Sequence, residues 1–242
     1  LNTTSSISYL YKLNSPFQIT YEYCSGSRPS DYLNILSLSG SGQSFFQESI
    51  DLHNYLFQNK APHSHDHYEF LIVLEGSLVQ KIEGKEYLYP AGYSCLINRN
   101  LFHTESFSQA TKVLFLGFSA DFFIKLINVN HSAYFSEENL IKNTLLYDFI
   151  TDDINNPGRK AYLDFIPTLH NRMPLETLHQ FAEGLINSIL FPKFGSTYII
   201  NGLLCSILYY LSAPEHYHCT CVELDNNSDY LLFSRVEHFL EE

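Results

Sequence analysis

Two stretches of sequence predict most about the fold: residues 63–76, HSHDHYEFLIVLEG, and residues 84–92, GKEYLYPAG. In the first stretch, His63 and His65 are two positions apart, so on a strand both side chains point to the same face. In the second stretch, proline and glycine supply tight corners between short strands. Together they predict strands that are separated by tight turns.

The position of the acidic residue in the first stretch restricts its geometry. On a straight strand, at about 3.3 Å per residue, His63 and Glu69 would stand roughly 20 Å apart. A site that both residues share therefore requires a reversal of the chain near Asp66.

Up to about residue 118, short apolar runs alternate with turn residues, which is typical of a sandwich or barrel. Two of these runs, residues 68–74 and 112–118, are apolar at both alternating positions, so we expect both of their faces to be covered. The predicted strands are residues 32–38, 44–50, 68–74, 78–82, 85–89, 93–97 and 112–118.

From about residue 120, the apolar spacing becomes that of helices. Ser136 fits an N-cap for a helix that continues through Leu145 and Phe149, and residues 156–158 (Asn-Pro-Gly) predict a turn. A further helix carries apolar residues at three- and four-residue steps from residue 175 to residue 189, before Pro192.

The last predicted helix, about residues 196–212, has an apolar arc that is too wide for a helix with one buried side. Two interpretations stay open: the helix is buried in the core of its own domain, or it also forms a two-fold subunit interface. The candidate dimerisation residues are Ile200, Leu203, Leu204, Ile207, Leu208 and Leu211.

Composition excludes several classes of protein. The 242 residues are 45% hydrophobic and 17% charged, which is typical of a folded protein. The net charge of −12 repels the phosphate backbone, so we do not expect these residues to hold DNA on their own. No apolar run reaches the roughly 18 to 20 residues that span a bilayer, and residues 1–12 lack a secretory signal. We therefore expect a cytoplasmic protein that does not bind membranes, with its five cysteines reduced.

A second cluster of metal-ligand residue types lies in residues 215–223, EHYHCTCVE. Alternation along a strand would put the two histidines on one side and the two cysteines on the other, which argues against one tetrahedral site. We expect a short strand or loop here.

The two opening stretches resemble the conserved motifs of cupins. The second cupin motif has a histidine three residues after its last glycine, where this chain has Cys95, and His103 follows later. The matching patterns are His63-x-His65-x3-Glu69-x6-Gly76 and Gly84-x5-Pro90-x-Gly92.

These residues form the candidate ligand-binding site in the interior of the barrel. We favour a hydrogen-bonded polar network at the strand corner, and predict neither a metal nor a cofactor. The alternative is a metal ion held by His63, His65, Glu69 and Cys95. The candidate ligand-binding residues are His63, His65, Glu69, Cys95 and His103.

In their order, residues 63–103 resemble the sensor domain of AraC-type (AraC/XylS) transcriptional regulators. Three further stretches agree with this resemblance. Thr111–Phe123 resembles the last barrel strand and first helix of that family, Leu185–Leu211 resembles its dimerisation helices, and Ser234–Glu242 resembles its linker.

The resemblance implies an α+β fold: a cupin-like antiparallel β-barrel (jelly roll) followed by a helical dimerisation subdomain. Residues 1–120 would form the effector-binding barrel with an N-terminal arm. Residues 121–232 would form the helical subdomain, and residues 233–242 would begin a linker to a helix-turn-helix DNA-binding domain that this sequence does not contain.

The implied function is that of a regulator and not of an enzyme. A homodimer would bind a small effector, either a sugar or an apolar metabolite, and control promoter DNA through the helix-turn-helix domain. The alternative is a metal-dependent cupin enzyme, an isomerase or a dioxygenase, which predicts bound Fe, Mn, Zn or Cu.

Overall fold

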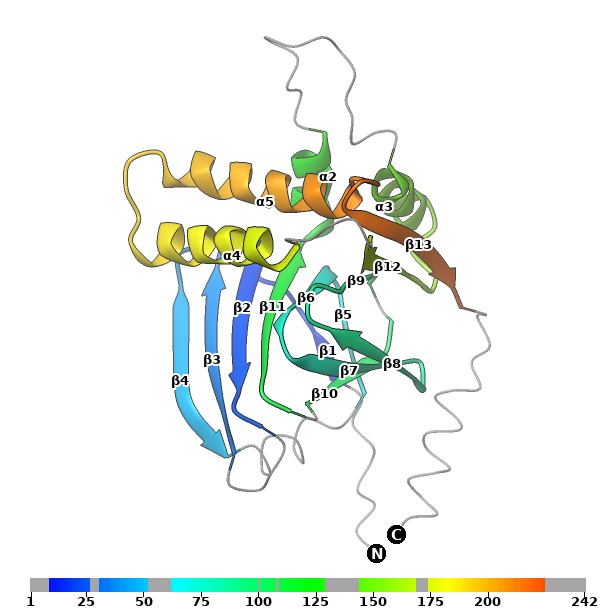
Figure 1. Cartoon of the computed structure of the whole chain (residues 1–242). Coiled ribbons are helices and arrows are strands. Elements are labelled where there is room, and N and C mark those ends of the chain that lie inside the picture. Colours follow the sequence, from blue (N-terminus) through cyan, green and yellow to red (C-terminus); the bar gives the residue numbers. More distant parts are fainter. Residues whose placement is uncertain are drawn as a thin grey trace, which may run out of the picture.

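The computed structural model describes residues 9–26, 31–51, 62–99, 101–107, 109–128, 144–168 and 174–224. The strands are β1 (Tyr9–Tyr11), β2 (Phe17–Cys24), β3 (Tyr32–Ser39), β4 (Ser44–Asp51), β5 (His63–His65), β6 (Tyr68–Glu75), β7 (Ser77–Ile82), β8 (Lys85–Pro90), β9 (Ser94–Ile97), β10 (His103–Phe107), β11 (Thr111–Phe118), β12 (Ala161–Pro167) and β13 (Tyr217–Glu223). The helices are α2 (Ala120–Ile127), α3 (Leu145–Asn155), α4 (Pro174–Leu190) and α5 (Ser196–Ser212) (Figure 1).

The strands form two sheets that pack against each other. The small sheet has the order β1-β5-β10-β7-β8, and the large sheet has the order β13-β12-β9-β6-β11-β2-β3-β4. Apolar side chains from both sheets, such as Leu71 of β6 and Leu78 of β7, form one buried cluster between them. The helices cover the other face of the large sheet (Figure 1).

Strands β6 and β11 are neighbours in the interior of the large sheet, and both of their faces are covered. Phe70 and Leu116 belong to the core shared with the helices. Leu71 and Val113 belong to the core between the two sheets. This confirms the prediction from their apolar sequences, because a strand with two covered faces needs apolar residues at both alternating positions.

Helices α4 and α5 lie side by side across one end of the large sheet (Figure 1). They pack closely because Gly184 has no side chain: a Cβ atom there would lie 3.1 Å from a methyl carbon of Leu203. The bounds of α5 are those predicted from the sequence. No helix in the described part of the chain is both long and apolar enough to span a bilayer.

The packing of α5 corrects the predicted dimer interface. Helices α2 and α4 and strand β13 enclose its apolar arc, which favours the interpretation of a helix buried in its own domain. Ile200 and Leu203 are partly buried against the same core. Four of the six candidate residues are at most 1% exposed and are not available to a second subunit: Leu204, Ile207, Leu208 and Leu211.

The seven predicted strands all form, each with one end shifted by a single residue. The prediction missed β1, β2, β5, β10 and β12, which are short or carry polar residues on the covered face. Because β12 and β13 extend the large sheet, residues 121–232 are not purely helical. The turn at residues 157–158 follows α3 as predicted, whereas Ser136 and residues 233–242 lie outside the described residues.

Candidate functional site

The chain crosses from one sheet to the other within the histidine-rich stretch. Strand β5 ends at His65 in the small sheet, and β6 begins at Tyr68 in the large sheet. This is the reversal near Asp66 that a shared site requires. It brings His65 Nε2 to 3.3 Å from a carboxylate oxygen of Glu69.

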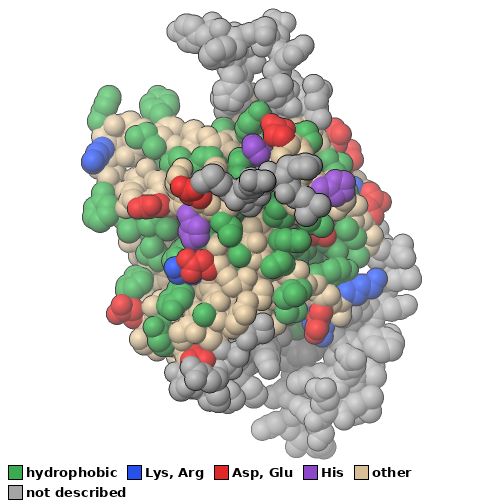
Figure 2. All heavy atoms as spheres, in the orientation of Figure 1, with side chains coloured by type: hydrophobic (Ala, Val, Ile, Leu, Met, Phe, Trp, Pro, Cys, Tyr) green, Lys and Arg blue, Asp and Glu red, His purple; other side chains and the backbone are tan. Residues whose placement is uncertain are grey.

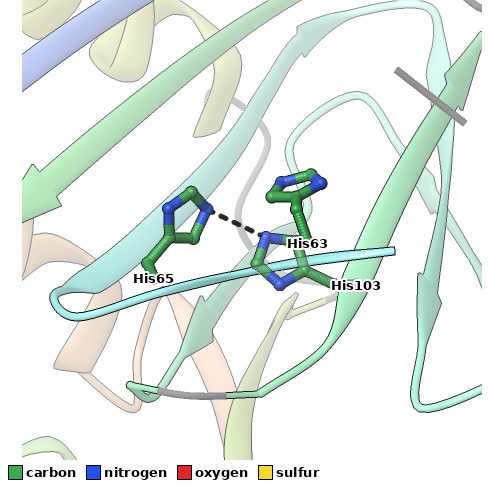
Figure 3. Close-up of side chains that lie close together, drawn as sticks. All are labelled: His63, His65 and His103. Carbon is green, nitrogen blue, oxygen red and sulfur yellow. Dashed lines mark hydrogen bonds between the residues drawn. The ribbon is translucent and has the colours of Figure 1, made fainter. Parts of the chain in front are cut away.

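Strand β10 brings a third histidine to this corner, because His103 pairs opposite His63 in the small sheet. His103 Nε2 lies 3.2 Å from His65 Nε2 and 3.4 Å from Glu69 Oε1. The rings of His63, His65 and His103 converge from two strands (Figure 3). We call these three residues and Glu69 the histidine cluster.

The orientation of the His103 ring follows from its backbone contact. Nδ1 lies 2.9 Å from the carbonyl oxygen of Leu101, and a carbonyl only accepts, so Nδ1 carries a hydrogen and donates it. Nε2 therefore faces the histidine cluster. Such a contact fixes an imidazole in the manner typical of metal ligands.

A second carboxylate borders the histidine cluster. Glu105 of β10 lies 3.7 Å from His103 Nε2 and 3.9 Å from His63 Nε2. Gln80 holds it in place by donating a hydrogen bond of 2.8 Å from Nε2. Two carboxylates and three imidazoles thus lie within a few ångströms of one another.

Opposite charges determine protonation in this cluster. Burial opposes the charged form of Glu69, but His65 and His103 outweigh it and hold the Glu69 pKa below its usual range. Burial also opposes the charged form of His103, but the hydrogen bond to Glu69 and the charge of Glu105 raise its pKa. Burial lowers the pKa of His65. A charged His103 therefore forms an ion pair with the Glu69 carboxylate, at 3.4 Å.

A cavity of about 330 Å³ opens between the two sheets beside the histidine cluster. Its wall on the large sheet includes Glu22 and Gly117, and Lys12 stands exposed where it meets the surface. A Cβ atom on Gly117 would lie 3.1 Å from the His67 ring, so the glycine makes room for that ring. The cavity is lined by Tyr11, Lys12, Gln18, Thr20, Glu22, His63, His65, His67, Glu69, Glu105, Phe107, Phe115 and Gly117.

Cys95 does not join the histidine cluster. It pairs opposite Leu71, two residues further along β6 than Glu69, which is about 7 Å away along the strand. It is fully buried between the sheets, and burial together with the charge of Asp164 raises its thiol pKa. The donor set His63, His65, Glu69 and Cys95 is therefore corrected: His103 takes the place of Cys95.

The corrected donor set fits a divalent transition metal. Among the described residues, His63, His65 and His103 offer ring nitrogens within 4.8 Å of one another, and Glu69 offers an oxygen within that distance of His103 and Glu105. Imidazole nitrogen and carboxylate oxygen are the usual ligands of Zn, Fe and Mn. His65 Nδ1 is buried without a hydrogen-bond partner among the described residues, so the polar network does not satisfy every atom.

The cavity also contains three residues that the sequence pattern did not predict: Glu22, His67 and Glu105. Glu22 and Glu105 stand alone in their strands, so no local pattern marks them. The role of His103 did leave a signal. If the second cupin motif starts at Gly92 instead of Gly84, its histidine falls on residue 103. In this alignment Asn98 stands in the position of the motif's proline, and Asn100 stands in the position of its last glycine.

Comparison with known families supports the fold. Residues 58–116 match the family model of the cupin domain. No curated protein matches the sequence. The chain therefore contains a cupin-like domain, mostly β-sheet, combined with a helical part, as the sequence predicts.

Several solved structures are similar at low identity. ToxT from Vibrio cholerae with bound unsaturated fatty acid is 13% identical, with 79% of this chain and 50% of that chain covered and a TM-score of 0.32. An apo ToxT variant is 12% identical, with 81% and 56% covered and a TM-score of 0.37. FeII HppE is 24% identical, with 40% and 50% covered and a TM-score of 0.24. TM-scores below 0.5 do not support an assignment of function.

Proposed function

With a cupin-like domain as the premise, we propose that the chain is the effector-sensing and dimerisation part of an AraC-type transcriptional regulator. The observation that carries this proposal is the order of motifs from His63 to Leu211, which matches the order of parts in that family's sensor domain. A ligand cavity on one face of the large sheet and a helix pair on the other suit such a sensor.

A hydrogen-bonded connection supports coupling between cavity and helices. Asn98 Nδ2 donates to Asp153 of α3 over 3.0 Å, and Arg99 pairs with the same carboxylate at 3.0 Å. Five residues after Asn98, the chain reaches His103 in the histidine cluster. A ligand that moves His103 would therefore pull on α3, and a differential effect of this kind is what allosteric control requires.

We assign the dimer surface to the end of the helix pair where α4 and α5 join. Figure 2 shows hydrophobic side chains gathered at that end of the molecule. Exposed apolar patches of this kind are typical of protein–protein interfaces. In a two-fold dimer the patches of the two subunits would pack against each other and be buried. The exposed residues are Leu190, Phe191, Phe194, Tyr198 and Ile199.

Promoter binding is assigned to a helix-turn-helix domain outside these 242 residues. The net charge of −12 makes the present part a poor ligand for DNA phosphates. The regulator proposal includes no catalytic step.

Light scattering on the purified chain and transcript profiling test this proposal together. We expect a dimer, a monomer for the double variant Phe194→Asp/Tyr198→Asp, and an unchanged dimer for the control Leu88→Asp, which alters an exposed apolar side chain on β8, away from the helix pair. A strict monomer, together with transcript profiles that do not respond to the full-length gene, would contradict the proposal.

The histidine cluster favours a second candidate, a metal-dependent cupin enzyme such as an isomerase or dioxygenase. His63, His65, His103 and Glu69 would hold the ion, which would supply Lewis-acid or redox chemistry to a substrate in the cavity. His103 would bind through Nε2, because Nδ1 donates to Leu101.

Elemental analysis tests this candidate. It predicts about one Fe, Mn, Zn or Cu ion per chain, lost in His65→Ala and retained in His179→Ala, which alters a half-exposed histidine outside the cluster. A metal-free preparation without turnover would remove the enzyme hypothesis and leave the sensor proposal in place.

A further inference from the structure

The wall of the cavity on β2 carries a buried carboxyl group, that of Glu22. Glu22 is 9% exposed and lines the cavity. No residue in the part of the chain that the structure describes forms a hydrogen bond or ion pair with it. Burial and the negative charges of Glu105 and Glu69 raise its pKa to about 8. Burying a carboxyl group without a hydrogen-bond partner costs free energy, and a ligand that forms a hydrogen bond or ion pair with it would remove this cost.

The surroundings of Glu22 are apolar and aromatic. In the large sheet, Val113 of β11 and Ile35 of β3 pair on either side of it. Phe115 lies on the same face of β11, two residues from Val113, and both Phe115 and Phe107 line the cavity. The faces of such rings attract cations, most strongly where water is excluded.

Glu22 differs in this respect from the other two cavity carboxylates. Glu69 and Glu105 have imidazole neighbours within 4 Å. None of the candidate metal-binding groups among the described residues includes Glu22. A metal in the histidine cluster would therefore not bind the Glu22 carboxyl group. A polar or charged group of the ligand has to interact with Glu22 instead.

We propose that the cavity binds a small molecule bearing a protonated amine, which Glu22 receives as an ion pair flanked by Phe107 and Phe115. This inference rests on the proposed function for the presence of a small-molecule ligand, and it names the class of that ligand. At Glu22, an anionic group would meet the negative charges of Glu105 and Glu69, and an apolar group would leave the carboxyl group without a hydrogen bond.

Binding also has a defined proton balance. Near neutral pH the Glu22 carboxyl group holds a proton in the free protein. When the ammonium group arrives, the carboxyl O–H bond breaks, the proton passes to the buffer, and the resulting carboxylate accepts an N–H hydrogen bond from the amine. The negative charges that act on Glu22 come from Glu69 of β6, in the same sheet, and from Glu105 of β10, in the opposite sheet.

Calorimetric titration with three matched probes tests the inference: 1,4-diaminobutane, 1,4-butanediol and succinate. They share a four-carbon chain and differ in whether its ends are ammonium, hydroxyl or carboxylate. At pH 7 we expect the diamine to bind at least about 10-fold more tightly than the diol, and succinate most weakly. Repetition in buffers of different ionisation enthalpy should reveal about one proton released per diamine bound.

Two variants locate the effect. In Glu22→Gln the preference for the diamine should disappear, whereas it should persist in Glu75→Gln, which alters an exposed carboxylate outside the cavity. The inference is overturned if the diamine fails to saturate the protein, binds no better than the diol, or is indifferent to Glu22→Gln. A preference for the diol would overturn it while leaving the sensor proposal intact. A strict monomer, together with transcript profiles that do not respond to the full-length gene, would contradict the sensor proposal and leave the measured preference for the diamine unchanged.

Discussion

The two faces of the large sheet are built from the same strands but have different roles: one packs against the helices, and the other lines the cavity. Towards the helices, β6 and β11 present an apolar surface that includes Phe70 and Phe118. Towards the small sheet, the alternate residues of the same strands include Glu69 and Gly117, and they line the cavity. Strand periodicity separates the two roles, so a substitution on one face should leave the other largely unaffected.

The charged groups on the two faces also differ. On the helix side, the fully buried Asp153 is matched by Tyr68, Asn98 and Arg99. On the cavity side, no described residue forms a hydrogen bond or ion pair with the buried Glu22 carboxyl group. Removing Asp153 would leave its buried partners unsatisfied, whereas Glu22 is a buried polar group that a ligand can satisfy.

The largest effect is expected from Phe70→Ala. Phe70 is fully buried, and its ring packs against those of Phe118, Phe123 and Phe165. We expect the free energy of unfolding to fall by about 4 kcal/mol, because the substitution leaves a cavity in the core. Urea unfolding measures it. A loss below about 1 kcal/mol would show that the helix face is not the main source of stability.

Asp153→Ala should have the next largest effect. It leaves the Arg99 guanidinium and the Tyr68 hydroxyl without their shared carboxylate, to which Tyr68 donates over 2.5 Å. We expect a loss of about 3 kcal/mol by urea unfolding. Asp153→Asn is the matched control and should lose less, since the amide keeps the shape. Equal losses would mean that the charge does not matter.

Glu22→Gln should change the pH dependence of stability. The Glu22 pKa is about 8 in the folded state and near its ordinary value of 4.5 when unfolded. Between these pH values the folded state keeps a proton that the unfolded state has released, so the free energy of unfolding of the wild type falls as pH rises. We expect Glu22→Gln to equal the wild type near pH 4 and to become progressively more stable than the wild type as the pH rises towards 8.

That comparison requires urea unfolding at several pH values. A difference between variant and wild type that is independent of pH would mean that Glu22 is not an unpaired buried carboxyl group.

Gly117→Ala should have the smallest effect. The new methyl group would press on the His67 ring at 3.1 Å, which costs about 1 kcal/mol if the ring shifts. Gly202→Ala on α5 is the control. Its methyl group would meet nothing within 4 Å, so helix propensity should make it neutral or slightly stabilising. Thermal unfolding distinguishes the two, and equal melting temperatures would contradict the close packing around Gly117.

Local patterns in the sequence were enough to predict much of the fold. The doubly apolar sequence of β6 indicated a strand covered on both faces, and the 3.6-residue spacing in α5 gave that helix its bounds. The spacing of His63, His65 and Glu69 required a reversal at Asp66, which the structure contains. Each of these inferences depends only on residues that are close together along the chain.

The composition of the site was decided by tertiary structure. Whether His103 or Cys95 joins the histidine cluster depends on the register between β10 and β5 and between β9 and β6. Glu22 reaches the cavity because β2 pairs with β11, some ninety residues away along the chain. Likewise, the sequence of α5 does not show which part of its apolar arc is buried in its own domain. The packing of α4, α2 and β13 around the helix determines that. Strand register and helix packing depend on contacts between distant segments, and no local periodicity encodes them.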